Sequence, residues 1–187
     1  MRFVSPDWPL ETSRLTLRPF VESDFEAVHA MRSDPEVARY LYQGPLSADE
    51  TRSRLERDMA LSAWSAEGDW LSVAVVERAT GLTIGDVAFH WVSERDRTAE
   101  VGFVFDPRYQ GKGFATEAAC ALLDWAFTEA GFHRVIGRTE ARNAASARVL
   151  EKLGMRLEAR LVENEWVKGE WQSELVYAIL DREWREP

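Results

Sequence analysis

The sequence has a single cysteine, no long apolar run and no surplus of positive charge, and each shortage excludes a class of protein. The lone Cys120 cannot form an internal disulfide, which suits a reducing compartment, and we expect it to be buried on a helix. The longest apolar runs, such as residues 71–76, are far too short to cross a bilayer. We therefore expect no membrane association through a spanning segment.

Basic residues are outnumbered, with 23 Lys and Arg against 32 Asp and Glu, giving a formal net charge of −9. Nucleic-acid binding needs a basic surface, so we expect no nucleic acid as the main partner. An acidic protein is compatible with a cationic substrate such as an amine. Residues 1–10 also lack the apolar stretch of a signal peptide, and the simplest expectation is a cytoplasmic protein.

Linkers are missing as well. No repeat, low-complexity tract or Pro/Gly/Ser-rich stretch interrupts the chain, so we expect residues 1–187 to form one domain. The content of hydrophobic residues, 45%, is that of an ordinary globular protein with a substantial core.

Apolar periodicity and turn residues predict seven strands and four helices in the order β-α-α-β-β-β-α-β-α-β-β. The first helix is capped by Asp24 and ends before Pro35, and the second runs from Ser47 or Asp49 to about Ala66. The later helices cover residues 113–130 and 144–153. The strands cover residues 12–20, 70–77, 83–91, 99–106, 132–140, 155–167 and 171–180. This order predicts an α/β or α+β sheet covered by helices.

The most informative segment is residues 106–115, where a strand ends, Pro107 and two glycines turn the chain, and a helix begins. Glycines at a helix start let backbone N–H groups approach a ligand closely, and the helix dipole adds positive potential. Phosphate is the natural ligand of such a site. An ordinary strand-to-helix turn is the alternative.

Two common phosphate loops do not fit this segment. A Walker loop fails because Asp106 stands at its first glycine and Gly113 follows Lys112 where Ser or Thr is required. A dinucleotide fingerprint starting at Gly111 fails because Thr116 occupies its third glycine position.

The segment instead resembles the coenzyme A pyrophosphate loop of GNAT N-acetyltransferases, Gln-x-x-Gly-x-Ala, at residues 110–115. Residues 143–146 (Asn-Ala-Ala-Ser) and 151–155 (Glu-Lys-Leu-Gly-Met) resemble a second motif of that family, with methionine where phenylalanine is usual. Residues 13–19 and 34–37 are similar to the RimJ/RimL-like branch. The resemblance covers about residues 10–180.

The resemblance implies a mixed, mostly antiparallel sheet that is splayed between its fourth and fifth strands, at residues 99–106 and 132–140. The thioester of acetyl-CoA would lie in this cleft, and no metal is implied. The backbone around Phe103, Val104 and Phe105, and the side chains of Asn143 and Ser146, would contact the pantetheine arm. The phosphates would lie near Arg108, Gln110, Gly111, Lys112, Gly113, Phe114, Ala115 and Thr116.

The reaction that the resemblance implies is direct attack of a neutral amine on the acetyl carbonyl, polarised by a backbone N–H near Phe105. Ser146 would protonate the departing thiolate, unless its hydroxyl only bonds its own helix. For the general base, Glu100 on the fourth strand ranks first, followed by Glu165 and His90. A water relay without a single base is the alternative.

The acceptor expected from these features is a protein or peptide N-terminal α-amine. An α-amine with a pKa near 8 is about one-tenth neutral at pH 7, whereas a lysine amine is less than a thousandth neutral. Acetylation of a small-molecule amine, such as an antibiotic or a polyamine, is one alternative. The other is a sensor that binds acyl-CoA without turnover. The sequence does not indicate an oligomeric state.

Overall fold

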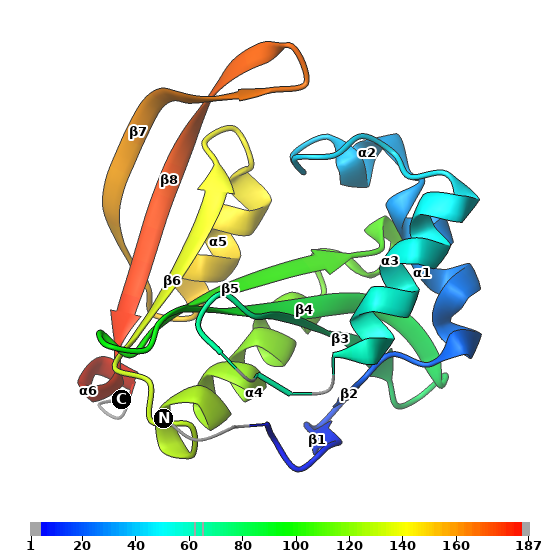
Figure 1. The fold of residues 1–187 in the computed structure, drawn as a ribbon, viewed down its shortest axis with the longest axis horizontal. Helices are drawn as coiled ribbons and strands as arrows, with labels where there is room; N and C mark the ends of the chain where they lie inside the picture. Colours follow the sequence, from blue (N-terminus) through cyan, green and yellow to red (C-terminus); the bar gives the residue numbers. More distant parts are fainter. Residues whose placement is uncertain (1–4, 62, 65, 185–187) are drawn as a thin grey trace.

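The computed structural model describes residues 5–184 apart from residues 62 and 65. It contains one eight-stranded sheet with helices on both of its faces (Figure 1). The strands are β1 Leu10–Glu11, β2 Leu15–Arg18, β3 Trp70–Glu77, β4 Leu82–Ser93, β5 Thr98–Phe105, β6 Arg134–Glu140, β7 Arg156–Val167 and β8 Glu170–Leu180.

The helices alternate with these strands much as the periodicity predicts. They are α1 Phe25–Arg32, α2 Pro35–Ala38, α3 Ala48–Ala60, α4 Phe114–Thr128, α5 Ala144–Lys152 and α6 Asp181–Trp184, with 3₁₀ turns at Glu22–Asp24 and Pro107–Tyr109. Among the described residues, no helix combines the length and the apolar character that spanning a membrane would need.

The two faces of the sheet carry different helices. Leu71, Phe89 and Val101 lie in the main core with α4 and α5, whereas Ala74 packs with Val28 of α1 and Leu55 of α3. Because side chains alternate along a strand, each central strand contributes to both layers. The class expected from the sequence, a mixed sheet between helices, is therefore confirmed.

The sheet opens between β5 and β6. The strand order is β1-β2-β3-β4-β5-β6-β8-β7, and β5–β6 is the parallel pair in an otherwise antiparallel sheet. These two strands pair only from Thr98 to Glu100 on β5, and beyond that point they diverge (Figure 1). This is the predicted splay, because the two strands expected at residues 99–106 and 132–140 are β5 and β6.

Three local expectations need correction. Asp24 is the N-cap residue of α1 as expected, but its carboxylate makes no capping hydrogen bond, because it accepts two hydrogen bonds from Arg18, at 2.7 and 2.9 Å. Helix α3 ends at Ala60 and not near Ala66, and the chain beyond it buries Trp64. Cys120 is exposed because it lies opposite the buried stripe of α4.

Candidate active site

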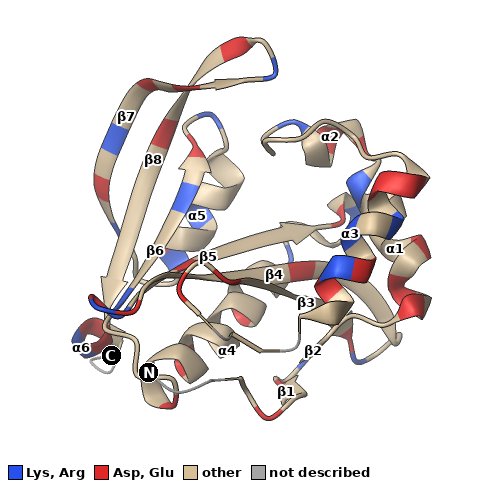
Figure 2. Cartoon of the chain, in the orientation of Figure 1, with Lys and Arg blue, Asp and Glu red and all other residues tan. Residues whose placement is uncertain are grey.

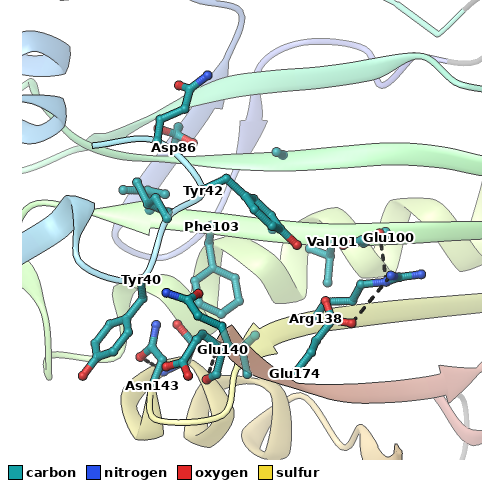
Figure 3. Close-up of a pocket in the computed structure, with 18 of the residues that line it drawn as sticks. Tyr40, Tyr42, Asp86, Glu100, Val101, Phe103, Arg138, Glu140, Asn143 and Glu174 are labelled. Atoms are coloured by element: carbon teal, nitrogen blue, oxygen red, sulfur yellow. Dashed lines mark hydrogen bonds and ion pairs between the residues drawn. The ribbon is translucent and has the colours of Figure 1, made fainter. Parts of the chain in front are cut away.

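A cleft of about 370 Å³ passes through the gap between β5 and β6, from one face of the sheet to the other. Phe103 and Asn143 line it on the side of α4 and α5, and Glu100 and Glu174 line it on the side of α1 and α3 (Figure 3). Ser146 of α5 also lines it. A ligand in this cleft is therefore contacted from both layers of the molecule.

Beyond Glu100, the edge of β5 that faces the gap has backbone groups with no strand paired to them among the described residues. The Asp106 N–H donates to the Ile84 carbonyl of the neighbouring strand at 3.0 Å, which fixes the alternation of the β4–β5 ladder. By that alternation, Phe103 and Phe105 direct their backbone groups toward the gap, and Val104 directs its groups toward β4. The Phe105 carbonyl already accepts a hydrogen bond from the Gln110 amide at 2.9 Å. The backbone of Phe103 is therefore available to an extended ligand.

The glycine loop places backbone donors beside this edge. Gly111 and Gly113 have φ values of 73° and 83°, which favour glycine, and Gly113 caps α4 without a side-chain hydrogen bond. Within the part of the chain that the structure describes, the first turn of α4 therefore has N–H groups free for an anion. Arg14 steadies the loop, since its guanidinium donates to the Lys112 carbonyl at 3.1 Å and pairs with Glu117 at 2.6 Å.

The side chain of Arg108, also expected near the phosphates, is engaged within the protein. It makes an ion pair with Asp106 at 2.6 Å, and this partner holds the pKa of the Asp106 carboxyl below its usual value. The pair leaves the Arg108 side chain largely exposed, so a contact with a phosphate stays a prediction.

Asn143 and Ser146 lie together at the start of α5. The Asn143 side-chain oxygen accepts a hydrogen bond from the Ser146 N–H at 3.1 Å, so it caps the helix as a cap residue should. Within the described chain, the Ser146 hydroxyl has no hydrogen bond to its own helix or to any other group. Both side chains line the cleft, and the Ser146 hydroxyl is free to act on a ligand.

On the other side of the sheet, Glu100 lies at the point where β5 and β6 part. Arg138 of β6 is between two carboxylates, with its Nε 3.6 Å from Glu100 Oε2 and its Nη1 3.7 Å from Glu174 Oε2 (Figure 3). Burial raises the pKa of Glu100, Arg138 opposes that shift, and Glu174 and Glu165 add to it.

His90, the third candidate base, lies on β4 directly opposite Glu100 in the β4–β5 ladder. Its Nδ1 is 4.0 Å from Glu100 Oε2, and its ring stacks on Trp70 at a centroid distance of 5.0 Å. Burial lowers the pKa of His90, with a further contribution from Arg138. Unlike Glu100 and Trp70, His90 is not among the cleft-lining residues.

The hairpin β7–β8 and the loop after α2 close the acceptor-facing side of the cleft. Lys168, at the hairpin turn, donates to the carbonyls of Ala38 and Arg39 at 2.8 and 2.9 Å. Farther in, the Tyr42 hydroxyl hydrogen-bonds Glu165 of β7, and burial together with this carboxylate raises the pKa of Tyr42 to about 12. The hairpin is thus tied to the α2 end across the cleft.

Sequence reasoning identified Glu100, Glu165, Asn143 and Ser146, which the structure brings into one cleft. It missed Arg138, Glu174 and Tyr42, which also line the cleft. For Glu174, the available signal was its alternation along β8: an acidic residue on the same face as the buried Gln172 is unusual. No local signal marked Tyr42, because it lies on an irregular loop.

An opened sheet with a donor-rich glycine loop on one side and carboxylates on the other suits an enzyme that transfers a group from an elongated, phosphate-bearing donor. The sequence model described as "Acetyltransferase (GNAT) domain" matches residues 14–156. The chain belongs to the GNAT family and is an N-acetyltransferase.

Individual relatives agree with this family. An uncharacterized N-acetyltransferase of Bacillus subtilis, YnaD, is 33% identical over 94% of this chain and 98% of its own length. The spermidine N(1)-acetyltransferase of Vibrio cholerae is 27% identical over 86% of this chain and 89% of its own length. The crystal structure of a GNAT-family acetyltransferase from Bacillus anthracis matches with a TM-score of 0.84 at 34% identity, covering 93% of this chain and 99% of the other.

Proposed function

We propose that this chain transfers the acetyl group of acetyl-CoA to a primary amine by direct attack, with Glu100 as general base and Ser146 as general acid. The observation that carries the proposal is a cleft through the sheet, which has a free hydroxyl on one side and a half-buried carboxylate on the other. Residues 1–187 act as one domain in this proposal.

The residues present fit coenzyme A. The free N–H groups at the start of α4 and the glycines of the loop suit the pyrophosphate, and the backbone of Phe103 suits the amides of the pantetheine arm. The Asn143 amide, whose oxygen caps α5, keeps its N–H groups for the same arm.

In the proposed reaction, the amine reacts on the Glu100 side of the cleft and the thiolate leaves on the Ser146 side. The amine nitrogen forms a bond to the acetyl carbon and gives up a proton to Glu100, whose elevated pKa makes it a better proton acceptor than an exposed carboxylate. The carbon–sulfur bond breaks, and the Ser146 hydroxyl passes a proton to the departing thiolate while it takes up a proton from water in the cleft. Glu100 then releases the proton of the amine to solvent. A backbone N–H near Phe105 polarises the carbonyl oxygen.

For the acceptor, we propose a small-molecule amine ahead of a protein N-terminal α-amine. Lys168 and the Tyr42–Glu165 contact close the cleft toward the α2 end, which suits a slender molecule better than the terminus of a folded protein. Similarity to spermidine N(1)-acetyltransferases at 24–27% identity supports this order. The RimJ/RimL-like motif at residues 13–19 and 34–37 supports the N-terminal amine.

The test is a turnover assay that detects free thiol, run with aliphatic amines, aminoglycosides and N-terminal peptides. Turnover of amines supports the proposal, and mass spectrometry of the product then distinguishes acceptor classes. Acetyl-CoA binding without turnover of any amine, peptide or aminoglycoside would instead make the chain a sensor.

Changing Ser146 to alanine should lower kcat about tenfold and leave KM for acetyl-CoA nearly unchanged. The reason is that the hydroxyl acts only as the thiolate departs, and a thiol with a pKa near 8.5 is a tolerable leaving group even unprotonated. Alanine favours helix, so the fold is preserved. Steady-state kinetics check this, and an unchanged kcat with chemistry rate-limiting would return Ser146 to a structural role.

The phosphate loop is tested by a matched pair, Gly111→Asp and Gly111→Asn. A side chain at this position enters open space, and both replacements tolerate the left-handed φ of 73°. Only aspartate adds a negative charge beside the proposed pyrophosphate. We expect acetyl-CoA to raise Tm in the wild type and in Gly111→Asn, and to bind at least about tenfold more weakly to Gly111→Asp. If acetyl-CoA raised Tm equally in Gly111→Asp and Gly111→Asn, the pyrophosphate would not bind at this loop.

A further inference from the structure

The acceptor-facing half of the cleft has more negative charge than it needs for one amine. Three of its carboxylates are those of Glu100, Glu165 and Glu174, and the first and last of these share one guanidinium, that of Arg138. The other carboxylates along the cleft have partners of their own, with Asp86 paired to Arg32 at 2.5 Å and Glu140 paired to Arg142 at 2.9 Å. Figure 2 shows acidic positions on both strands of the β7–β8 hairpin.

Glu174 is the carboxylate that most needs a partner. Its side chain is only 6% exposed, and its Oε2 accepts no hydrogen bond within the described chain although it lines the cleft. The nearest cationic atom, Arg138 Nη1, is 3.7 Å away, which is too far for a hydrogen bond. Asn164 hydrogen-bonds the Glu174 carboxylate, but Oε2 is left without a hydrogen bond. A buried charged oxygen in that state is costly, and a cationic ligand would remove that cost.

Glu165 faces the same space. It pairs with Gln172 across the β7–β8 ladder, and Gln172 and Glu174 are two residues apart on β8, so all three side chains lie on one face. The Tyr42 hydroxyl supplies Glu165 with one hydrogen bond, and a carboxylate can accept several more. Glu165 and Glu174 therefore form a pair on the hairpin, separate from Glu100 on β5.

We propose that Glu165 and Glu174, with Tyr42 beside them, bind a second ammonium of the acceptor while its reacting amine lies at Glu100. The acceptor is then a linear aliphatic diamine or polyamine. This inference rests on the proposed function, and it adds a site and a charge requirement to it. The reacting amine must be neutral to attack, so the second, protonated amine supplies the attraction that brings the acceptor into an acidic cleft.

The test compares diamines of three to six carbons with monoamines of the same carbon number, at low and at moderate salt. A charge-assisted contact to a buried carboxylate predicts a kcat/KM ratio of about 10 to 100 in favour of the best diamine. Glu174→Gln and Glu165→Gln should bring that ratio close to one. Glu163→Gln is the matched control, because Glu163 is exposed on the same hairpin and outside the cleft, and it should keep the ratio.

Binding is measured separately by calorimetry with CoA present, so that turnover is not needed. Tighter binding of the diamine than of the monoamine, lost in Glu174→Gln, supports the subsite. If neither amine is acetylated, that absence of turnover overturns only the proposed function. A diamine that binds and reacts no better than its monoamine would overturn the subsite and leave the acetyltransferase proposal standing.

Discussion

Replacing Glu100 by glutamine is expected to lower kcat/KM for the amine by about 10²–10⁴-fold at neutral pH. The carboxylate lies where β5 and β6 part, at the inner end of the acceptor half of the cleft, and glutamine keeps its shape while it removes its basicity. Steady-state kinetics at fixed acetyl-CoA measure the loss. KM for acetyl-CoA should change little, because the thioester donor enters from the other side.

The pH profile separates a base from a merely structural carboxylate. A base works in its ionised form, so activity is lost as pH falls through the pKa of Glu100. Because burial, Glu174 and Glu165 raise that pKa, against the opposing effect of Arg138, the acid limb should lie above the ordinary carboxyl range. Glu100→Gln should abolish this limb and keep the rise caused by deprotonation of the amine.

Two non-carboxylate groups near Glu100 have shifted pKa values. Tyr42, with its pKa raised to about 12, stays neutral throughout the acid limb. The pKa of His90 is lowered by burial, so this ring is neutral at pH 7 but can titrate on the acid side. The acid limb is assigned to Glu100 by its loss in Glu100→Gln, which leaves His90 in place. Glu100→Asp should restore part of the limb, since it keeps an acid at a shorter reach. If Glu100→Gln retained activity within about threefold of the wild type, the water relay would be the correct mechanism.

Much of the fold was predictable because the signals were local. The strand at Trp70–Glu77 was predicted as a short apolar run bounded by turns, and Ser47, the cap of α3, was one of the two helix starts predicted, the other being Asp49. The ion pair of Asp24 with Arg18 was not predicted, because Arg18 lies on another element and competes with the backbone of α1 for the carboxylate. The early end of α3 likewise depends on the packing of Trp64 against Trp125, at a ring distance of 5.1 Å.

In the candidate site too, features with a local sequence signal were predictable and features that depend on distant residues were not. The glycine loop and Asn143 could be identified from sequence because contiguous residues carry both motifs. The carboxylate cluster could not, since Glu100 and Glu174 belong to strands that the sheet brings near only through β6, where Arg138 lies between them. Ranking Glu100, Glu165 and His90 from the sequence was possible, but their relation in space depends on the sheet order.

The buried ion pair between Arg32 of α1 and Asp86 of β4 gives the largest expected effect on stability. The two charges lie 2.5 Å apart, with side chains 7% and 4% exposed, between α1 and the sheet. Changing Arg32 to methionine leaves Asp86 buried without its cation, which should lower the free energy of unfolding by about 3–5 kcal/mol. Asp58 adds to the cost, because burial and Asp86 raise its pKa while Arg32 opposes that shift. Urea denaturation measures the change.

The double variant Arg32→Met/Asp86→Leu is the control, and it should recover most of the lost stability. The pair is not fully satisfied, since Arg32 Nε is buried and has no hydrogen bond within the described chain. Apolar residues of similar volume avoid the desolvation of both charges, and such replacements are often neutral or stabilising. A single variant within about 1 kcal/mol of the wild type would mean that water reaches Asp86 through the cleft, whose lining includes both residues.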